Sequence, residues 1–561
     1  MPPFFTSFKI DVFLKKLPHL SLFGLERMLM LKNSNVVELK ILYTSDIHGH
    51  IMPIHYGTNE QAASGLSRYA TAVKQIRSKT DNVIVLDNGD LIQGTPLMTH
   101  FVKQYANEIN PLIQAMNMIN IDAGVIGNHE FNFGKQILQS AINQSNYPWI
   151  AANVIDTKIN KPKYGPPYVI KRLKNGIKVA IIGVTTHYIP NWESPDHIAG
   201  IHFSDAFTTL KSWVTYVREN EHPDLVVAAY HGGFERDIET GEATEVSTGE
   251  NQGYAMCQIE GIDVLLTGHQ HRQLTETVNN VLVVQPGSNG TAYGEVGIMF
   301  GKSGDGWKIR QKKAFIQSLH NIPPDPDILK TTADIEKSTQ QWLDQPVGYI
   351  KGDMTIDDPF FARLTKHPFI EFIQNVQIEA SGADISVTSL FDNNSKGFPS
   401  TVTVRDIVSN YIYPNTLVVL KLKGQDIKAA LEKSAAYFTL DDQDAIIVNP
   451  AYEHPKPQHY NYDMWEGITY TINVARPVGD RIKTLNYRGK PILEHEHFNV
   501  VLNNYRASGG GDYDMFQYKP VVKEIQKEAA ALIREYFEKY TTVEATKTEN
   551  FKVIANKGNP S

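Results

Sequence analysis

Short apolar runs, spaced along the first half of the chain, constrain its fold more than any other feature. Most of them are rich in Val and Ile and too short for helices, so they predict buried β-strands. Amphipathic stretches at 65–76 and 207–218 predict helices with one apolar face, and the alternation predicts an α/β domain. The runs are 39–43, 83–86, 124–126, 179–184, 225–229, 264–266 and 281–284.

Polar side chains follow five of these runs at the point where each run ends. In open α/β sheets, ligands bind just beyond the carboxyl ends of the strands. Any one of these segments alone would fit an ordinary polar cap, but chance explains the whole set poorly. The segments are Ser45-Asp46-Ile47-His48, Asp87-Asn88-Gly89-Asp90, Asn128-His129, His231-Gly232-Gly233 and Thr267-Gly268-His269-Gln270-His271.

Asp, His and Asn side chains form a mixed oxygen and nitrogen ligand set. Such a set is typical of sites for Mn, Zn or Fe ions, and it fits less well with an all-oxygen calcium cage or a thiolate zinc site. The alternation in Asp46-x-His48 and His269-x-His271 directs both side chains of each pair to one edge of the chain. Asp90 can bridge two ions, because a carboxylate has two oxygens. Two ions about 3.5–4 Å apart clamp a phosphate and activate a water, so we predict a dinuclear site.

This ordered set of motifs resembles the calcineurin-like metallophosphoesterases. The shared motifs are Asp-x-His, Gly-Asp, Gly-Asn-His-Glu, a lone His and Gly-His-x-His. The resemblance implies that His129 stabilises the transition state or protonates the leaving oxygen. Mn²⁺ or Zn²⁺ is the expected metal, with Fe, Co or Ca as alternatives. The implied ligands are Asp46, His48, Asp90 and His271 for one ion, and Asp90, Asn128, His231 and His269 for the other.

Asn132 departs from the pattern of the 5'-nucleotidase relatives, in which an aspartate three residues after this histidine orients it. An amide can still hold a ring nitrogen, but it cannot stabilise imidazolium as a carboxylate does. The same departure resembles one branch of the superfamily, the bacterial 2',3'-cyclic-nucleotide 2'-phosphodiesterase/3'-nucleotidases. We therefore expect His129 and Asn132 to be the catalytic pair.

A proline-rich segment from Pro323 to Pro326, with a polar helical stretch after it, predicts a domain connection. Beyond it, helices at 369–380, 424–437 and 521–540 and strands at 416–422, 468–474 and 498–502 predict a second α/β domain. The chain after Thr541 is polar and is expected to be mobile. The expected divisions are a poorly ordered leader (1–37), a four-layer α/β/β/α metallophosphoesterase domain (38–322), a linker with a spanning helix (323–345), a 5'-nucleotidase-type substrate-binding domain (346–545) and a polar tail (546–561).

Two stretches of the second half resemble the substrate-binding domain of the 5'-nucleotidase superfamily, and both look more like its cyclic-phosphodiesterase branch. They are Tyr413-Pro414-Asn415-Thr416 and the loop from Asn503 to Tyr513, which contains three consecutive glycines. Two tyrosines from separate loops can stack on a base, although tyrosines beside turns more often serve packing. The predicted substrate-binding residues are Tyr413 and Tyr505, with Tyr513 in reserve, and Asn503, Gly509 and Gly510. The arginine of the 5'-nucleotidase phosphate loop is missing at 389–393.

Charge and composition limit the partners. The net charge of −7 argues against a surface that coats nucleic acid, so we expect a small-molecule nucleotide as substrate and no nucleic-acid polymer. No run approaches the roughly 18 apolar residues of a membrane span, and no clear signal peptide is present. We expect a monomer or weak dimer in the cytoplasm rather than an exported protein; the single cysteine, Cys257, decides little.

These features predict a phosphoesterase that hydrolyses 2',3'-cyclic nucleotides and 3'-nucleotides to nucleoside and phosphate. The rival enzyme is a 5'-nucleotidase or nucleotide-sugar hydrolase. An alternative from another class is a non-catalytic nucleotide-binding sensor on the same scaffold. The presence of every implied ligand argues against the sensor, because degenerate family members normally lose ligands.

Overall fold

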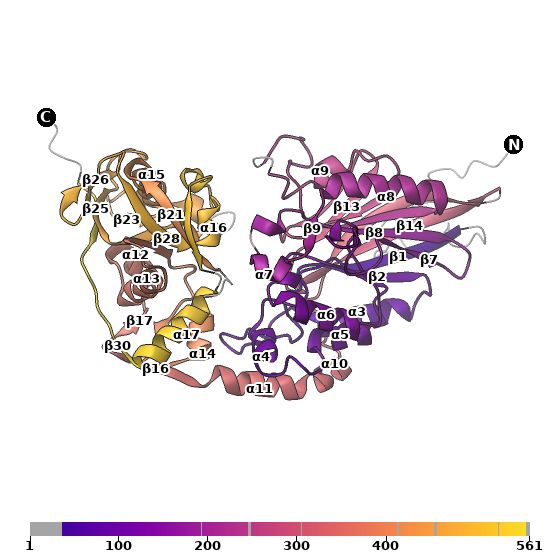
Figure 1. Cartoon of the computed structure of the whole chain (residues 1–561), viewed down its shortest axis with the longest axis horizontal. Helices are drawn as coiled ribbons and strands as arrows, with labels where there is room; N and C mark the ends of the chain where they lie inside the picture. Colours follow the sequence, from indigo (N-terminus) through magenta and orange to yellow (C-terminus); the bar gives the residue numbers. More distant parts are fainter. Residues whose placement is uncertain are drawn as a thin grey trace, which may run out of the picture. The chain divides into compact units, whose positions relative to one another are not determined.

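The computed structural model describes residues 36–191, 193–244, 248–304, 306–411, 415–453, 457–525 and 527–556. The chain forms two compact units. The first holds the chain up to Ile54 and Gln61–Glu336, and the second holds His55–Glu60 and the chain from Lys337 onward. Figure 1 colours the first unit from indigo to pink and most of the second unit from salmon through orange to yellow. The predicted leader lies outside the described residues, except that β1 begins at Val36.

The first unit contains two six-stranded sheets within its described residues. In spatial order, the strands of the first sheet are β15 (Gly306–Ser318), β14 (Ala292–Ser303), β1 (Val36–Thr44), β2 (Val83–Asp87), β3 (Ala123–Val125) and β4 (Trp149–Ile150). Those of the second sheet are β12 (Gln273–Val278), β13 (Val281–Pro286), β11 (Val264–Leu266), β10 (Leu225–His231), β8 (Lys178–Thr185) and β7 (Tyr168–Arg172).

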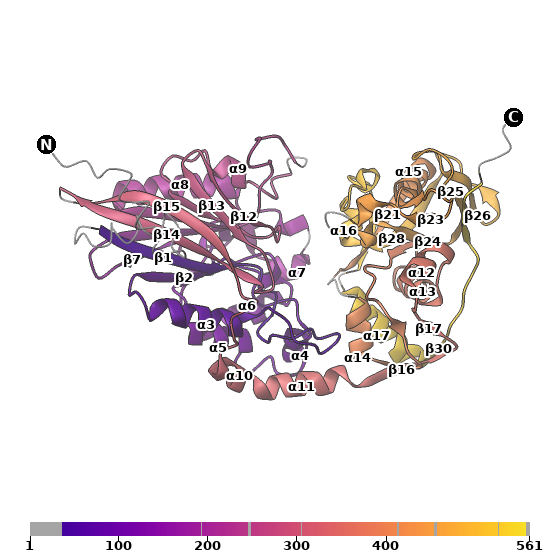
Figure 2. The ribbon, with the colours of Figure 1, turned by 180° about the vertical axis from the view of Figure 1, so that it is seen from behind.

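Helices cover the outer faces of the two sheets and produce four layers, α/β/β/α. On one side lie α3 (Leu66–Arg77), α5 (Pro111–Ile119) and α6 (Gly134–Gln144), and on the other lie α8 (Ala206–Asn220) and α9 (Gly253–Met256). Figures 1 and 2 show this order from opposite sides. A core of Val, Ile and Leu side chains from both sheets fills the space between them. The predicted four-layer domain is confirmed.

The apolar runs became strands because both faces of each sheet are buried, which suits continuous rather than alternating apolar sequence. All seven predicted strands are present, within three residues of their expected ends. β1, β2, β3 and β4 run parallel, and so do β8, β10, β11 and β13. The carboxyl ends of parallel strands meet at one edge of a sheet, so the loops after them are brought together.

Two helices follow the proline-rich segment, α10 (Pro326–Thr331) and α11 (Ala333–Leu343). Asp325 caps α10 by accepting hydrogen bonds from the backbone N–H groups of Asp327 and Ile328, and its carboxylate lies 2.6 Å from Lys74 Nζ on α3. The division between the two units falls inside α11, between Glu336 and Lys337. Among the described residues, no helix has both the length and the apolar character that crossing a bilayer requires.

The second unit is built around a mixed five-stranded sheet in its described residues. Helix α13 (Pro368–Ser381) packs on this sheet, with Pro368 in its first turn and Gly382 in the left-handed conformation at its end. Helix α15 (Gly424–Ala435) follows β21, which lies between β28 and the edge strand β29. The strands in spatial order are β24 (Asp463–Glu466), β18 (Ile385–Ser389), β28 (His497–Asn503), β21 (Leu417–Lys423) and β29 (Val521–Ile525).

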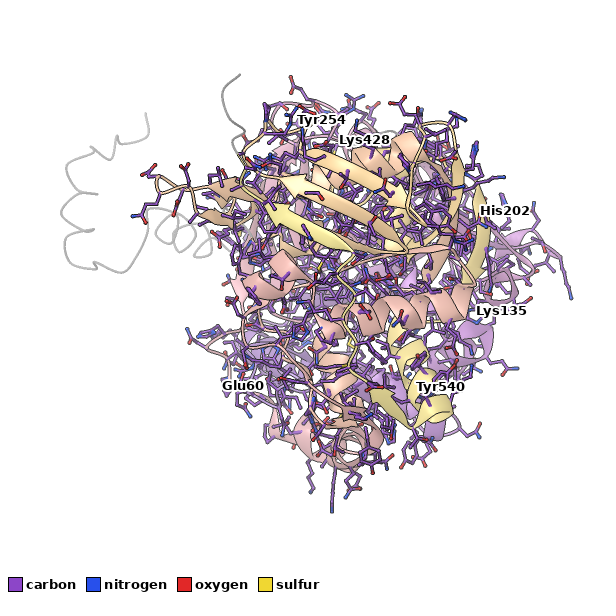
Figure 3. The ribbon with its side chains drawn as sticks, turned by 90° about the vertical axis from the view of Figure 1, so that its left-hand side faces the viewer. Glu60, Lys135, His202, Tyr254, Lys428 and Tyr540 are labelled. Carbon is purple, nitrogen blue, oxygen red and sulfur yellow. The ribbon has the colours of Figure 1, made fainter. Side chains whose placement is uncertain are left out.

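The prediction of one helix over 521–540 is wrong. Val521–Ile525 is the edge strand β29, paired antiparallel with β21, and the helix α17 is confined to Ala529–Tyr540. Val521 and Val522 are β-branched, which favours a strand. The backbone hydrogen bonds of this segment are made with β21, a distant partner that sequence periodicity does not reveal. Figure 3 labels Tyr540 at the end of α17.

The prediction of a mobile segment after Thr541 is also wrong for the described residues. Thr542–Glu544 forms β30, which pairs with β16 (Pro346–Lys351), and Phe551–Ile554 forms β31, which pairs with β25 (Ile468–Asn473). Between these strands, the buried Lys366 ammonium contacts Thr548 Oγ1 and Asn550 Oδ1, both at 2.9 Å. The polar residues of this segment therefore hold it to the second unit.

We expect Phe551→Ala to destabilise the second unit by about 3–5 kcal/mol, the usual cost of removing a buried Phe ring. Phe551 is buried and stacks on Tyr470 with 5.2 Å between ring centroids. Urea denaturation followed by circular dichroism measures the change. Lys552→Ala, at an exposed position of the same strand, is the control, and equal midpoints for the two variants would show that the strand does not anchor the unit.

Candidate active site

Five loops at the carboxyl ends of β1, β2, β3, β10 and β11 bring together all seven predicted ligand residues. Three overlapping groups of His and Asp side chains have their ligand atoms within 4.8 Å of one another. These groups are Asp46, His48 and His271; His48, Asp90 and His129; and Asp90, His231 and His269. Asn128 joins the third group through its amide oxygen.

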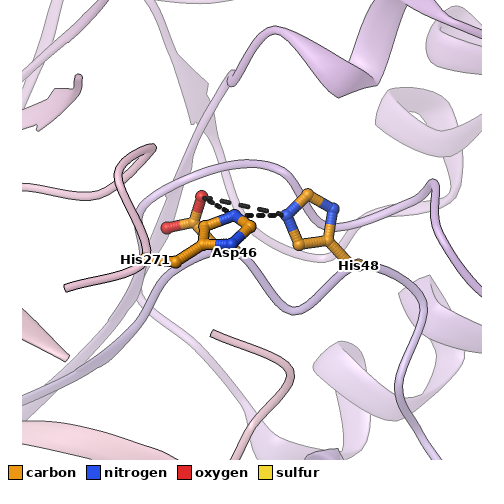
Figure 4. A group of neighbouring side chains, drawn as sticks. All are labelled: Asp46, His48 and His271. Atoms are coloured by element: carbon orange, nitrogen blue, oxygen red, sulfur yellow. Dashed lines mark hydrogen bonds and ion pairs between the residues drawn. The ribbon is translucent and has the colours of Figure 1, made fainter. Parts of the chain in front are cut away.

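Asp46, His48 and His271 form one half of the site (Figure 4). His48 Nε2 lies 3.0 Å from His271 Nε2, and Asp46 Oδ1 lies 3.5 Å from His271 Nε2 and 4.0 Å from His48 Nε2. Two ligands that are each about 2.1 Å from one ion are about 3.0 Å apart at a right angle and about 3.4 Å at the tetrahedral angle. The three ligand atoms are therefore spaced closely enough to face one cation.

Asp90, Asn128, His231 and His269 form the other half. His231 Nε2 lies 3.1 Å from Asp90 Oδ2 and 3.1 Å from Asn128 Oδ1, and His269 Nδ1 lies 3.0 Å from the same Asn128 oxygen. Asp90 also belongs to a group with His48, so its carboxylate lies between the two halves. This position suits a bridging ligand.

Three of the histidines use their second ring nitrogen to contact an acceptor outside the ligand set. His48 Nδ1 lies 3.2 Å from the Gln93 carbonyl, His231 Nδ1 lies 2.7 Å from the Asn88 carbonyl, and His269 Nε2 lies 2.9 Å from the Glu250 carboxylate. Carbonyl and carboxylate oxygens only accept, so each of these nitrogens carries the proton. In a neutral ring, the nitrogen that faces the site then keeps its lone pair, as a metal ligand requires. At His231, burial lowers the pKa but the charge of Asp90 outweighs it and raises the pKa to about 10, so a metal bound there displaces a proton from Nε2.

The backbone is strained at most of these positions. Asp46, His48, Asp90, His269 and His271 have φ between 47° and 68°, the left-handed region that L-residues rarely adopt. Such conformations cost about 1–3 kcal/mol each and persist only where the surroundings enforce them. Gly127 and Gly268 adjoin these residues, and a Cβ at either position would collide with Asp90 and Ser45, respectively. The loops are therefore shaped to direct side chains inward.

Charge interactions keep the two carboxylates ionised. Burial alone would raise the pKa of Asp46, but its hydrogen bond with His271 and the charge of His231 outweigh burial and lower that pKa. Burial is likewise outweighed at Asp90, whose pKa the charges of His231 and His129 hold well below its usual value. Burial lowers the pKa of His48 to about 3, against the raising effect of Asp90. Asp46, Asp90 and His48 are thus in the ionisation states that bind a cation.

Glu130, whose role the sequence did not reveal, ties two of the loops together. Its fully buried carboxylate accepts hydrogen bonds from the backbone N–H groups of Asp90, Leu91, Ile92 and Gly127, at 2.6–3.2 Å. Burial raises the pKa of Glu130, and the neighbouring charge of Asp90 adds to that effect. One side chain therefore sets the spacing between the loop after β2 and the loop after β3.

We expect Glu130→Gln to weaken metal binding by about 10–100-fold, as for other residues that orient ligands without touching the ion. The introduced amide would place its own N–H groups against the backbone donors that now share the carboxylate. Isothermal titration of the metal-free protein measures the affinity. Glu219→Gln, at an exposed position of α8, is the control, and equal affinities in both variants would remove Glu130 from this role.

His129 lies beside both halves of the site and contacts Asn132. Its Nδ1 is 2.5 Å from Asn132 Oδ1, and its Nε2 is 4.0 Å from Asp90 Oδ2. The His129 backbone N–H donates to Asp90 Oδ1 at 2.8 Å, which holds the residue beside the bridging carboxylate. Asn132 is therefore hydrogen-bonded to the histidine, as the motif predicted.

Two carboxylates behind the site carry no motif that would have identified them. Glu250 contacts His269, as described above, and Glu193 accepts a hydrogen bond from Asn132 Nδ2 at 2.7 Å. Glu193 lies 61 residues from Asn132 in the chain, and only tertiary folding brings the two side chains together.

The predicted substrate-binding residues of the second unit have different surroundings. Tyr505 is 44% exposed, and its ring meets the Tyr460 ring edge-on with 6.5 Å between centroids. Asn503 caps the short helix α16 (Asn504–Ala507) through the Arg506 backbone N–H. Gly509 and Gly510 lie in the following loop, and Gly510 packs against the Tyr505 ring, where a Cβ would collide with it. Tyr413 lies outside the described residues.

Tyr513 does not fit a base-stacking role. Its side chain is fully buried, its hydroxyl lies 2.7 Å from Ser434 Oγ and 2.9 Å from the Asn461 carbonyl, and its ring stacks on Phe516. Burial raises the pKa of this hydroxyl well above its usual value. Both faces and the polar end of Tyr513 are therefore in the core, for which the sequence contained no signal.

Comparisons with known proteins agree with this geometry. The family Calcineurin-like phosphoesterase matches residues 39–273, and the family 5'-nucleotidase, C-terminal domain matches residues 346–518. A candidate 5'-nucleotidase from Staphylococcus aureus, solved in complex with α-ketoglutarate, is 35% identical with a TM-score of 0.77, and the match covers 92% of this chain and 100% of that one. This chain belongs to the calcineurin-like phosphoesterases that carry a 5'-nucleotidase C-terminal domain.

Curated relatives support the same family membership. The 2',3'-cyclic-nucleotide 2'-phosphodiesterase/3'-nucleotidase of Yersinia enterocolitica is 28% identical over 84% of this chain and 81% of its own length. The trifunctional nucleotide phosphoesterase protein YfkN of Bacillus subtilis is 28% identical over 93% of this chain, which spans 39% of that longer protein. As a calcineurin-like phosphoesterase, the chain is a metal-dependent phosphoric ester hydrolase, as its motifs predicted.

Proposed function

We propose that this calcineurin-like phosphoesterase hydrolyses 2',3'-cyclic nucleotides and then the resulting 3'-nucleotides, releasing nucleoside and phosphate. The observation that carries the proposal is the convergence of seven ligand residues on His129, which is paired with an asparagine rather than an aspartate. The sequence resemblance associates that asparagine with the cyclic-phosphodiesterase branch. Relatives with this name in Yersinia, Salmonella and Haemophilus are 26–28% identical to the chain.

The donor set supports binding of two divalent ions, with Mn²⁺ or Zn²⁺ preferred by its mixed nitrogen and oxygen chemistry. Asp46, His48 and His271 would hold one ion, and Asn128, His231 and His269 the other, with Asp90 shared between them. When bound, the ions polarise the phosphoryl oxygens and activate the attacking water.

His129 acts on the leaving group in this proposal. Asn132 Oδ1 accepts a hydrogen bond from Nδ1 of the ring, so that in the imidazolium form the proton on Nε2 is the one free to be delivered. That nitrogen lies 4.0 Å from Asp90 Oδ2, next to the place where the phosphate would be held. Protonation by Nε2 allows the ribose oxygen to leave as a hydroxyl in both steps. In the second unit, we propose that the exposed ring of Tyr505 stacks on the base.

A 5'-nucleotidase is the second candidate. The S. aureus protein at 35% identity, described as a candidate 5'-nucleotidase, favours it. The two activities need the same metal site and the same proton donor, and they differ in which ribose oxygen leaves. The non-catalytic sensor is disfavoured, since all seven ligand residues and His129 are in place.

We expect higher kcat/KM for 2',3'-cyclic AMP and 3'-AMP than for 5'-AMP, measured as phosphate and nucleoside release in parallel assays. Activity should disappear in excess chelator and return with Mn²⁺, because the bound ions supply the positive charge that polarises the phosphate. Faster hydrolysis of 5'-AMP would select the second candidate instead. Full activity in excess chelator would contradict both.

We expect His129→Ala to reduce turnover of 3'-AMP by about 10²–10⁴-fold, the usual contribution of a general acid. The ligand atoms remain, so metal content measured by atomic emission should not change. Near-normal turnover would show that the ribose oxygen leaves without help from His129.

A further inference from the structure

A chain of four polar side chains runs outward from His129. His129 Nδ1 lies 2.5 Å from Asn132 Oδ1, Asn132 Nδ2 donates to Glu193 Oε2 at 2.7 Å, and Glu193 Oε1 lies 2.8 Å from His197 Nδ1. His129 and Asn132 precede α6 in the sequence, and Glu193 and His197 follow it. The Glu193 carboxylate thus contacts the far side of the Asn132 amide, which occupies the position of the expected aspartate.

The chemistry of Glu193 determines the direction of these hydrogen bonds. An ionised carboxylate can only accept, so Asn132 must turn its NH₂ group toward Glu193. The Asn132 carbonyl oxygen then faces His129, and that oxygen can only accept as well. His129 therefore keeps a proton on Nδ1 whether the ring is neutral or doubly protonated. The proton that it can deliver is then the second one, carried on Nε2, the nitrogen that faces the phosphate site.

The segment that carries Glu193 is firmly held. Glu193 is 8% exposed, its N–H donates to the Ile189 carbonyl at 3.0 Å, and its Oε1 also accepts from the Ser194 N–H at 2.7 Å. The His197 ring packs against Gly134 at the start of α6, where a Cβ would lie 3.3 Å from the ring. Lys135, which is labelled in Figure 3, donates to the Ala199 carbonyl at 3.0 Å. The carboxylate is therefore held at a defined position behind Asn132.

We propose that Glu193 is a positioning residue for the reaction, which orients the Asn132 amide so that His129 presents Nε2 to the leaving oxygen. The assignment rests on the proposed role of His129 as proton donor. Glu193 supplies, through Asn132, the negative charge that an aspartate in place of Asn132 would supply directly. Asn132 and Glu193 together thus take the place of a single aspartate: the amide contacts His129, and the carboxylate lies behind the amide.

A substitution and a side-chain exchange test this assignment. Glu193→Gln retains size but can either donate or accept, so the Asn132 amide is free to turn over and the ring proton of His129 loses its fixed place. The double variant Asn132→Asp/Glu193→Gln exchanges the two groups, so that the new carboxylate accepts from His129 Nδ1 and from the introduced amide. Asn132→Asp alone would place two carboxylates against each other, and their repulsion disfavours ionisation of both.

The readout separates proton donation from general damage. The phosphoryl group is the same in 3'-AMP and p-nitrophenyl phosphate, but nitrophenolate leaves without protonation whereas the ribose oxygen does not. Glu193→Gln should lower kcat for 3'-AMP by about 10–100-fold with unchanged KM, and should leave kcat for p-nitrophenyl phosphate unchanged. The double variant should recover most of the lost 3'-AMP activity, and Glu219→Gln on α8 should match the unmodified protein on both substrates.

Several results would overturn the assignment. Equal loss on both substrates would show that Glu193 only supports the structure, and unchanged 3'-AMP turnover would show that it does not orient Asn132. If the double variant turns over 3'-AMP no faster than Glu193→Gln does, the two side chains are not interchangeable as the proposal requires. If His129→Ala keeps its 3'-AMP activity, the proposed proton donor is wrong and the role of Glu193 is lost with it. If His129→Ala has a large effect but Glu193→Gln has none, only the role of Glu193 is rejected.

Discussion

The parallel strands of the first unit end at common edges, and the site depends on this constraint. β1, β2 and β3 lie in one sheet and β10 and β11 in the other. The end of β10 supplies His231, and the loops that follow the other four strands supply the remaining six ligand residues. Five of those residues have left-handed backbone conformations, so the loops turn sharply as soon as the strands end. Strain of this kind is tolerated because the surrounding sheets and buried contacts leave the loops no relaxed alternative.

Carboxylates outside the ligand set hold the residues of these strained loops in place. Glu130 gathers four backbone N–H groups from two loops, Glu250 fixes which nitrogen of His269 carries the proton, and in our proposal Glu193 does the same for His129 through Asn132. Each of the three acts on a different part of the site: the spacing of its loops, a candidate ligand and the proposed proton donor. Such groups account for much of the precision of a metal site, although they do not touch the ion.

The sequence predicted the parts of the structure in which local pattern and final environment agree. Continuous apolar runs became strands buried on both faces. Motif residues with fixed spacing, such as His269 and His271 of Gly268-His269-Gln270-His271, lie beside the other predicted ligand residues. It failed where the environment overrode the pattern. Val521–Ile525 continues a helical stretch by periodicity but pairs with β21, and Phe551–Ile554, in a polar tail, pairs with β25. Tyr513, beside three glycines, lies in the core.

By itself, the sequence determined the α/β class, the four-layer catalytic domain, the family and the set of residues that could bind metal, because these follow from short-range periodicity and from ordered motifs. Only the tertiary structure decided how those residues are held. Glu193 and Glu250 are identified by what they touch, and their partners lie 61 and 19 residues away in the chain. A lone carboxylate has no sequence signature, since its role depends on the donors that folding places around it.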